Sequence, residues 1–275
     1  MANLNDFQFS QASLQDFQDC RRRFFLRYVE KLGWPAIEAE PALLNEELMQ
    51  QGADFHRLVH QFFLGVPPKL LSQMVSGENL KVWWENFMSN LPATSSSQLF
   101  PERVLTTHLA GYGLLAKFDL IVLGEKDKFI IYDWKTSRKS GSRSWLKQRL
   151  QTKVYPYVLA KAGHVFLDGE GVNPENIKMV YWYANSPEES VKFDYQKETM
   201  VQDEEFITSM IEEIASLEGI DDYLLTDDKT QCRFCEYRSL CNRGEKAGLV
   251  DDNIEVSQAK LEVMIDFEQI QEIEF

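Results

Sequence analysis

The sequence has 275 residues, a formal net charge of −14 at pH 7, 44% hydrophobic residues and 26% charged residues. This balance is typical of a globular chain with enough length for a packed core, and it excludes a disordered one. The negative charge argues against a surface that binds nucleic acid all over, although it allows a local basic groove. Apolar runs fall short of the roughly 20 residues that span a bilayer, and the N-terminus lacks the basic and apolar regions of a signal peptide. We therefore expect a cytoplasmic protein that makes no use of a membrane.

The first part of the chain predicts three helices. They are expected over residues 14–32, 43–64 and 69–90. The first begins after Ser13, where Asp16 lies three residues later as in a capping box, and Gly33 with Pro35 ends it. A loop over residues 92–97 follows the third helix. The N-terminal part is therefore expected to be helical.

The pattern then changes to runs rich in Val, Ile, Leu, Phe and Tyr, which predict strands. Strands are expected over residues 102–109, 112–123, 129–135, 177–183 and 191–195, and helices over 144–162 and 197–217. Residues 119–123 and 129–132 are apolar on both alternating faces apart from Asp119, as in a sheet that is covered on two sides. The expected class is α+β, with a mixed central sheet flanked by helices.

The turn over residues 124–128 sets which side chains of the two adjoining strands face each other. If Asp119 pairs directly with Asp133, the turn is centred on Lys126 and the loop has an odd length. A loop of two or four residues would place the two aspartates on opposite faces, because a one-residue slip turns every side chain over. A metal site shared by both aspartates therefore requires the odd loop.

Asp119 and Asp133 are ionisable residues inside otherwise apolar strands. A charge buried in a sheet is costly unless it is paired or binds a metal. Lys135 lies two residues after Asp133, so both side chains point to the same face. Two carboxylates that hold Mg²⁺ or Mn²⁺, with a lysine that stabilises developing charge, fit metal-assisted phosphodiester hydrolysis. Taken alone, the Asp-x-Lys motif favours a structural salt bridge at the end of the sheet.

Two further motifs accompany these acids. Gly52-x3-His56 lies on the second expected helix, and Gln151-x3-Tyr155 lies on the helix after the sheet. A lone histidine is more often a core or surface residue than a ligand, and His60 one turn later is a rival. Gln151 and Tyr155 share a helix face, so they could contact DNA or simply pack. Basic residues gather in two stretches: Arg21, Arg22, Arg23 and Arg27, and then Lys135, Arg138, Lys139, Arg143, Lys147, Arg149 and Lys153.

The sequence contains four cysteines: Cys20, Cys232, Cys235 and Cys241. The last three are spaced C-x2-C-x5-C. Structural disulfides are not expected in a cytoplasmic protein. Four thiolates fit either zinc or a [4Fe–4S] cluster, and inert cysteines at chance spacing are the remaining alternative. A single centre would clamp the start of the chain to its last quarter.

Taken in order, these motifs resemble a known family. The set is Cys20, Gly52-x3-His56, Glu102, Asp119, Asp133-x-Lys135, Gln151-x3-Tyr155 and Cys232-x2-Cys235-x5-Cys241. It is similar to the iron–sulfur branch of the PD-(D/E)XK nucleases, which includes the nuclease domain of AddB and the CRISPR-associated exonucleases and is close to the RecB nuclease domain. The resemblance covers roughly residues 10–243. Phe118 stands where the family has proline, Ala116 where glycine is common and Asp133 where glutamate is frequent, but every catalytic functional group is retained.

The resemblance implies a restriction-endonuclease-like fold with a [4Fe–4S] cluster on the four cysteines. It implies His56, Asp119 and Asp133 as metal ligands, Lys135 as the catalytic lysine, and Gln151 with Tyr155 as a helix motif that faces DNA. Glu102 matches an acidic position of less defined, supporting role. The implied nuclease domain covers residues 1–243, with a helical part (10–95), a core (96–218) and a cysteine segment (219–243), and an acidic tail follows at 244–275.

The function implied by the resemblance is that of a deoxyribonuclease dependent on Mg²⁺ or Mn²⁺. We expect an exonuclease on single-stranded or open DNA ends, in DNA repair, recombination or a similar process. The sequence contains no helicase motif such as a Walker A loop, so the chain acts alone or beside a helicase or another DNA-processing protein. Two alternatives stay open: a catalytically silent DNA-binding or scaffold module of the same fold, and a four-cysteine zinc protein whose acids are structural.

Overall fold

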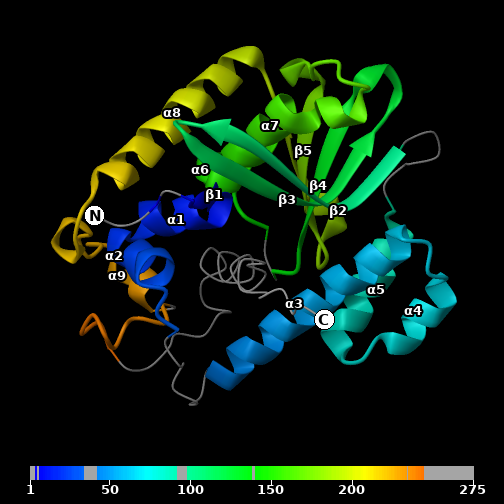
Figure 1. Cartoon of the computed structure of the whole chain (residues 1–275). Coiled ribbons are helices and arrows are strands. Elements are labelled where there is room, and N and C mark those ends of the chain that lie inside the picture. Colours follow the sequence, from blue (N-terminus) through cyan, green and yellow to red (C-terminus); the bar gives the residue numbers. More distant parts are fainter. Residues whose placement is uncertain are drawn as a thin grey trace, which may run out of the picture.

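A mixed six-stranded sheet between two helical layers forms the centre of the molecule (Figure 1). The computed structural model describes residue 4 and residues 6–33, 42–91, 98–137, 140–233 and 235–244, with the backbone alone for 42–46. The predicted α+β class with a mixed sheet flanked by helices is confirmed. Pro35, the loop at 92–97, Arg138, Lys139 and nearly all of the acidic tail lie outside the described residues.

The chain begins with a short strand that was not predicted, β1 (Gln8–Ser10), which leads into α1 (Gln11–Asp19). The predicted helix start after Ser13 is wrong, because Ser10 is the N-cap. The Ser10 Oγ accepts the Ser13 N–H at 3.2 Å, and the Ser13 Oγ accepts the Ser10 N–H at 2.9 Å. Asp16, the expected capping partner of Ser13, forms ion pairs with arginines instead. After the extended residue Cys20, the chain continues as α2 (Arg21–Phe24) and the π-helical turn η1 (Phe25–Val29).

Three helices form one layer: α3 (Ala42–Phe63), α4 (Pro68–Met74) and α5 (Glu78–Ser89). The first agrees with the predicted second helix, whereas the predicted third helix is in fact two. The break falls before Gly77, whose φ of 86° lies in the left-handed region that glycine adopts readily. Aromatic side chains of α3 and α5 pack on one face of the sheet, including Phe55, Trp83, Trp84 and Phe87.

The sheet has the order β1-β3-β4-β5-β6. In addition, β2 pairs with the edge of β3 that β1 and β4 do not use. Its further strands are β2 (Gln98–Leu109), β3 (Tyr112–Leu123), β4 (Phe129–Lys135), β5 (Ile177–Tyr183) and β6 (Val191–Asp194). β1 runs parallel to β3, and β4 runs parallel to β5, while the other pairs are antiparallel. One edge of β3 therefore pairs with β1 near its start and with β4 near its end.

The hairpin between β3 and β4 has the predicted register. Leu123 lies opposite Phe129 and Leu120 lies opposite Tyr132, which centres the turn on Lys126. The Gly124 N–H donates to the Lys128 carbonyl at 2.8 Å and closes the odd loop 124–128. Asp119 and Asp133 are the next residues after the last pair, Leu120 and Tyr132, one on each strand. The prediction of an odd-length loop is confirmed.

The second helical layer covers the other face of the sheet. It consists of α6 (Arg143–Gln148), α7 (Leu150–Ala162) and α8 (Lys197–Ser216), together with α1. The single helix predicted over 144–162 is broken, because Arg149 is extended with φ −67° and ψ 140°. Short 3-10 turns occur at η2 (Glu125–Asp127), η3 (Gly163–Phe166), η4 (Pro174–Asn176), η5 (Pro187–Glu189) and η6 (Ile220–Asp222).

The two ends of the described chain lie side by side. The segment from η6 to α9 (Lys229–Cys232) packs against α2, and the Arg22 N–H donates to the Leu224 carbonyl at 3.3 Å. Figure 1 shows the blue N-terminal helices next to the orange segment that contains α9. Within the described ranges, no helix is both long enough and apolar enough to span a bilayer.

Candidate active site

The candidate site lies where β3 and β4 separate. Their ladder ends at Leu120 and Tyr132, so the next residues in each strand, Asp119 and Asp133, lie at the opening of a fork. β4 continues past the fork along β5, where Lys135 lies opposite Tyr183. The Trp134 N–H donates to Asp119 Oδ2 at 2.8 Å, so a side chain takes the place of the next backbone partner in β3. The fork therefore presents side chains from both strands at one point of the sheet.

The alternation of β3 shifts by one residue at this fork. Ala116 and Phe118 pack in the core on the α7 side, and so does Ile121, whereas strict alternation would have placed Ile121 on the other face. Across the ladder, Pro101 pairs with Leu120 and Arg103 with Phe118, and Glu102 between them has a φ of 49°. A non-glycine residue in this region is strained by about 1–3 kcal/mol, and such strain gathers at functional sites.

Three ligand-type side chains meet at the fork: His56 from α3, Glu102 from β2 and Asp119 from β3. One nitrogen or oxygen of each lies within 4.8 Å of the others. His56 Nδ1 is 3.2 Å from Asp119 Oδ1, and the two side chains are 21% and 16% exposed. Glu102 also forms an ion pair with Lys117 of β3. A nitrogen and carboxylate oxygens are suitable ligands for a hard or borderline divalent cation.

The charges at the fork shift the pKa values of His56 and Asp119 in opposite directions. Burial lowers the pKa of His56, but the adjacent Asp119 carboxylate, with Glu102 and Asp133 beyond it, outweighs burial and raises the pKa above its ordinary value. For Asp119, burial acts to raise the pKa, but His56 and the Trp134 N–H bring it below its ordinary value. Asp133 is thus close enough to act on His56, although it lies outside the set that meets within 4.8 Å.

Asp133 and Lys135 form a buried ion pair, with Lys135 Nζ 2.8 Å from Asp133 Oδ2 and side-chain exposures of 6% and 7%. Gln151 of α7 contacts both: its Nε2 donates to Asp133 Oδ1 at 2.5 Å, and its Oε1 accepts from Lys135 Nζ at 3.1 Å. The Lys135 ammonium also lies over the Tyr181 ring, 5.5 Å from its centroid. One amide side chain therefore orients both members of the pair.

The helix motif of Gln151 and Tyr155, which was expected to face DNA, is largely buried. Gln151 is only 3% exposed and points at Asp133 and Lys135. Tyr155 is 7% exposed and its ring packs against Phe118 at a centroid distance of 5.0 Å, so base stacking on this ring is not available. Trp145 of α6 is only half-buried, and the Arg149 guanidinium lies 5.1 Å from its ring centroid.

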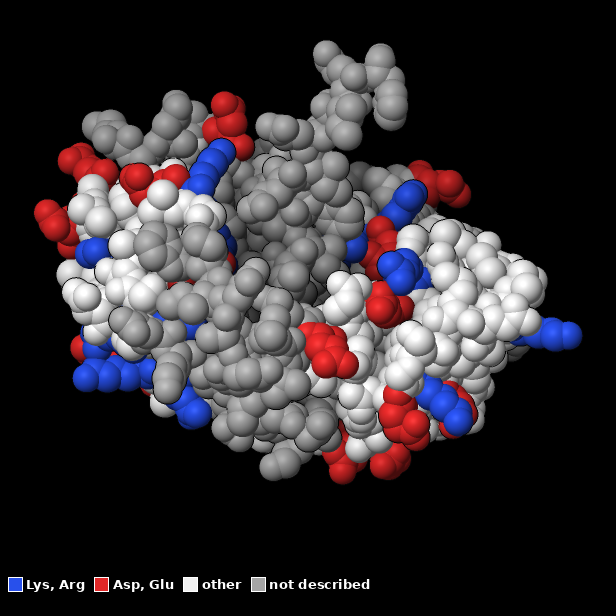
Figure 2. All heavy atoms as spheres, turned by 90° about the horizontal axis from the view of Figure 1, so that it is seen from below, with Lys and Arg blue, Asp and Glu red and all other residues white. Residues whose placement is uncertain are grey.

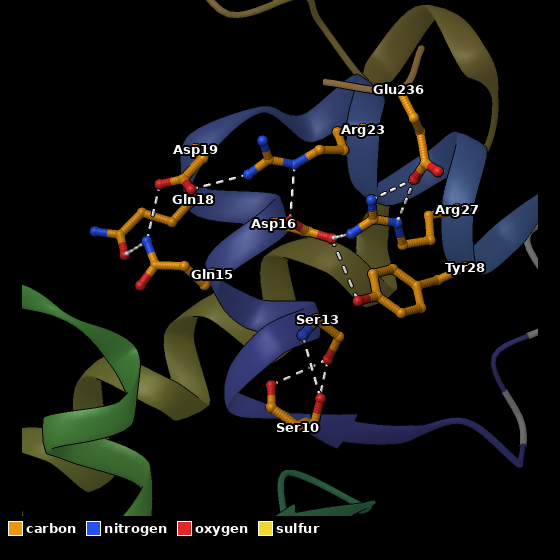
Figure 3. A network of polar contacts seen from close by, with 10 residues as sticks. All are labelled: Ser10, Ser13, Gln15, Asp16, Gln18, Asp19, Arg23, Arg27, Tyr28 and Glu236. Atoms are coloured by element: carbon orange, nitrogen blue, oxygen red, sulfur yellow. Dashed lines mark hydrogen bonds and ion pairs between the residues drawn. The ribbon is translucent and has the colours of Figure 1, made fainter. Parts of the chain in front are cut away.

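The N-terminal arginines are structural rather than part of an open basic surface. Figure 3 shows Asp16 between Arg23 and Arg27, at 2.7 and 2.5 Å, while Arg23 also pairs with Asp19 at 2.8 Å. The Arg27 Nε donates to Glu236 Oε1 at 3.0 Å, which ties η1 to the cysteine segment. Arg21 pairs with Glu213, and the Arg22 Nε donates to the Tyr223 carbonyl at 2.8 Å.

The four cysteines come from three places in the fold. Cys20 lies between α1 and α2, Cys232 ends α9, and Cys235 and Cys241 lie in the turns that follow. Burial raises the pKa of the Cys235 thiol to about 11, with a smaller contribution from Cys20. Burial also raises the pKa of Cys232 and Cys241, and Cys20 again adds to it. Cys20 is therefore within electrostatic reach of the other thiols, but no three of these sulfur atoms lie within 4.8 Å of one another.

The predicted site residues thus divide into groups. His56, Asp119, Asp133, Lys135 and Gln151 come together at the fork, and Tyr155 packs beside it. The cysteines lie where the N-terminal helices meet the last part of the described chain. Glu102 was assigned only a supporting place, yet it meets His56 and Asp119. Its position opposite Asp119 in a hairpin pairing of β2 with β3 is the signal that would have indicated this.

Comparisons with known proteins identify the family of this chain. No curated protein matches the chain. Among solved structures, SSO0001 matches with 15% identity and a TM-score of 0.42, over 85% of each chain. The "Putative exonuclease" from Eubacterium rectale matches with 9% identity and a TM-score of 0.46, over 77% of this chain and 81% of the other. The model of the PD-(D/E)XK nuclease superfamily matches residues 8–242, nearly all of the described chain. The mixed sheet between two helical layers agrees with the restriction-endonuclease-like fold, and the chain belongs to the PD-(D/E)XK nuclease superfamily, whose members hydrolyse phosphodiester bonds.

Proposed function

We propose that this chain is a deoxyribonuclease that depends on Mg²⁺ or Mn²⁺ and degrades DNA from single-stranded or open ends. The observation that carries the proposal is the fork of β3 and β4. There, His56, Glu102 and Asp119 meet within 4.8 Å, next to the buried Asp133–Lys135 pair. Carboxylates, an imidazole and a lysine at one point of the sheet are the groups that metal-assisted phosphodiester hydrolysis requires.

The donor set fits a divalent cation of the Mg²⁺ or Mn²⁺ class. Its charged oxygen ligands come from Glu102 and Asp119, its nitrogen from His56, and Asp133 stands beside them. When bound, such a cation neutralises phosphate charge and makes a water molecule acidic enough to serve as the nucleophile at neutral pH. His56 must be neutral to act as a ligand, so its raised pKa makes binding compete with a proton.

Lys135 is the residue that we assign to the developing charge on the phosphate. It is held in place by Asp133 and Gln151, and its ammonium group is almost fully removed from water. A charge in such a dry site acts more strongly on a phosphate than a solvated one. Preorganisation by Gln151 also removes the need to order the lysine during the reaction.

DNA contact is confined to a small area in this proposal. Acidic and basic side chains intermingle among the described residues on the face in Figure 2, and no continuous basic band crosses it. Lys147 is exposed on α6, and Trp145 with Arg149 offers a ring and a cation beside it. Stacking of an unpaired base on an aromatic ring contributes about 1–3 kcal/mol, which favours single-stranded ends. A helicase or another DNA-processing protein in repair or recombination would supply such ends.

For the cysteines we propose a [4Fe–4S] cluster that fastens the N-terminal helices to the last quarter of the domain. Cys20 acts electrostatically on the other three thiols, while Arg27 and Glu236 already join the same two segments. Tetrahedral zinc would bring four sulfurs to about 4 Å from each other, whereas no three of the described sulfurs lie within 4.8 Å of one another. In a cluster each sulfur binds a different iron, so the sulfurs stand farther apart. Iron and sulfide analysis of anaerobically purified protein tests this, and stoichiometric zinc without sulfide would refute it.

The decisive test of the function compares wild type with Asp133→Asn and a matched control, Asp194→Asn. Asp194 lies in β6, 68% exposed, and pairs with Lys178 far from the fork in the sheet order. We expect wild type and the control to shorten end-labelled linear DNA with Mg²⁺ or Mn²⁺, and Asp133→Asn to leave it intact. A circular single strand should resist.

Three outcomes would contradict parts of the proposal. Equal cutting by Asp133→Asn would show that the fork is not the active site or that the activity is a contaminant. Cutting of circles as fast as of linear strands would refute the requirement for ends. No cutting of any DNA by cluster-loaded wild type would identify the chain as a silent module of the nuclease fold.

A further inference from the structure

The N-terminal end of α7 is fixed by a residue of α1, near the start of the chain. The first N–H groups of a helix have no partner within the helix and need one from outside. Arg149, the N-cap of α7, gives no side-chain cap. The Leu150 N–H donates to Gln15 Oε1 at 3.1 Å, across 135 positions of sequence. Gln15 of α1 therefore does for α7 what a local cap usually does.

The residue directly after this contact is Gln151, which orients the proposed catalytic pair. Its amide joins Asp133 at 2.5 Å and Lys135 at 3.1 Å, so each of its two ends has a partner. Both contacts depend on where the first turn of α7 lies relative to β4. A shift of that turn would lengthen one or both of them.

Gln15 is itself held in a single orientation. Its oxygen must face Leu150, because a backbone N–H can only donate. Its Nε2 donates to Asp19 Oδ1 at 2.8 Å and, at 3.4 Å, to Gln18 Oε1. Asp19 is paired with Arg23, Arg23 with Asp16, and Asp16 with Arg27, which reaches Glu236 in the cysteine segment (Figure 3). Gln15 is only 6% exposed, so water does not readily replace either contact.

From these contacts we infer that Gln15 is a positioning residue of the active site: it sets the start of α7 so that Gln151 holds Asp133 and Lys135 in their reactive arrangement. This inference rests on the proposed nuclease function for its catalytic consequence. The ion-pair network behind Gln15 extends the same support to Glu236 in the cysteine segment. Only an amide fits the position, because one end must accept from Leu150 and the other must donate to Asp19.

The experiment compares Gln15→Met with Gln18→Met, measured at a temperature at which both variants are fully folded. Gln18 is an exposed residue of the same helix whose Oε1 accepts a long hydrogen bond of 3.4 Å from Gln15 Nε2. The control therefore repeats the chemical change while leaving Gln15 its contacts with Leu150 and Asp19. We expect Gln15→Met to lower kcat by about 10- to 100-fold, as small misplacements of reacting groups do, with KM for DNA changed less than about twofold. The control should match wild type.

A double-mutant cycle shows whether Gln15 acts through Gln151. If it does, adding Gln15→Met to Gln151→Met should lower kcat no further, because the group that Gln15 positions is already absent. Effects that multiply in full would overturn the inference. So would a Gln15→Met enzyme with unchanged kcat, or one whose loss appears only in thermal stability or in KM.

Amide hydrogen exchange keeps this test separate from that of the proposed function. Exchange at Leu150 should be slow in wild type and in Gln18→Met, and clearly faster in Gln15→Met. Equal exchange in all three would refute the positioning contact whatever the activity. A wild type that cuts no DNA but shows the expected exchange pattern would refute the nuclease proposal and with it the effect of Gln15 on kcat. The hydrogen bond from Leu150 to Gln15 would still be supported.

Discussion

The buried pair of Asp133 and Lys135 allows folding and catalysis to be separated by mutation. The side chains are 6% and 7% exposed, and their charged atoms lie 2.8 Å apart. Lys135→Met leaves the Asp133 carboxylate without its cation, and Asp133→Leu leaves the ammonium without its anion. Removing one member of a buried pair costs about 3–5 kcal/mol, whereas replacing both by apolar residues of similar volume is often close to neutral.

We therefore expect each single variant to unfold about 6–20 °C below wild type, since 1 kcal/mol corresponds to about 2–4 °C for a domain of this size. The double variant should unfold well above either single variant. None of the three should hydrolyse DNA, because each lacks a group of the fork. Stability and turnover would then follow different patterns across the same set of proteins.

Thermal unfolding is measured by calorimetry in the presence of a chelator, so that no bound cation replaces the missing charge. Turnover is measured separately on end-labelled DNA with Mn²⁺. If the two destabilisations add, so that the double variant is less stable than both single variants, the pair is solvated and the reasoning from its burial is refuted. A double variant that retains turnover would refute the assignment of Lys135 to catalysis.

Three further predictions concern pH, metal binding and the cysteines. The pKa of His56 is raised in the folded, metal-free protein. Its contribution to the free energy of unfolding is therefore complete below the unfolded pKa of about 6.5 and is lost as pH rises through the folded pKa. Urea unfolding of wild type and His56→Gln between pH 6 and 9 should show this loss of stability with rising pH in wild type alone. Glu102→Gln should weaken Mn²⁺ binding by at least about tenfold in calorimetric titration, whereas Glu125→Gln in the exposed hairpin turn should not, and equal affinities would remove Glu102 from the ligand set. Cys20→Ser should lower the unfolding temperature while leaving kcat per folded molecule close to that of wild type, and a selective fall in kcat would contradict a purely structural role for the cysteine centre.

The sheet was predictable because its signals are local. The odd loop centred on Lys126 follows from the spacing of the two aspartates, and the ladder from Leu120 to Leu123 has that register. The spacing of Asp133 and Lys135 alone places them on one face of β4, and their contact follows. Periodicity also predicted α3 and α8 nearly to their ends.

Other features depend on contacts that no local pattern records. β1 has only three residues, and its partner in β3 lies over a hundred positions later, as Phe9 opposite Leu114 shows. Ser13 and Asp16 match a capping box, but Ser10 has the geometry and Asp16 is required by Arg23 and Arg27. The cap that Gln15 provides for α7 likewise depends on two distant segments.

The contact between Arg27 and Glu236 spans 209 positions of sequence, and it sets an order of events during synthesis. At about 5–20 residues per second, a ribosome needs roughly 10 to 40 s to add the segment between them. Throughout that time α1, α2 and η1 exist without the surface that covers them, and Asp16 is not yet enclosed by its full network. The fork in the sheet is encoded by residues that leave the ribosome earlier, but its support from the N-terminal helices becomes complete only with the last quarter of the domain. A nascent chain halted before residue 236 should therefore be held by chaperones or cleaved by proteases more readily than one that has passed it.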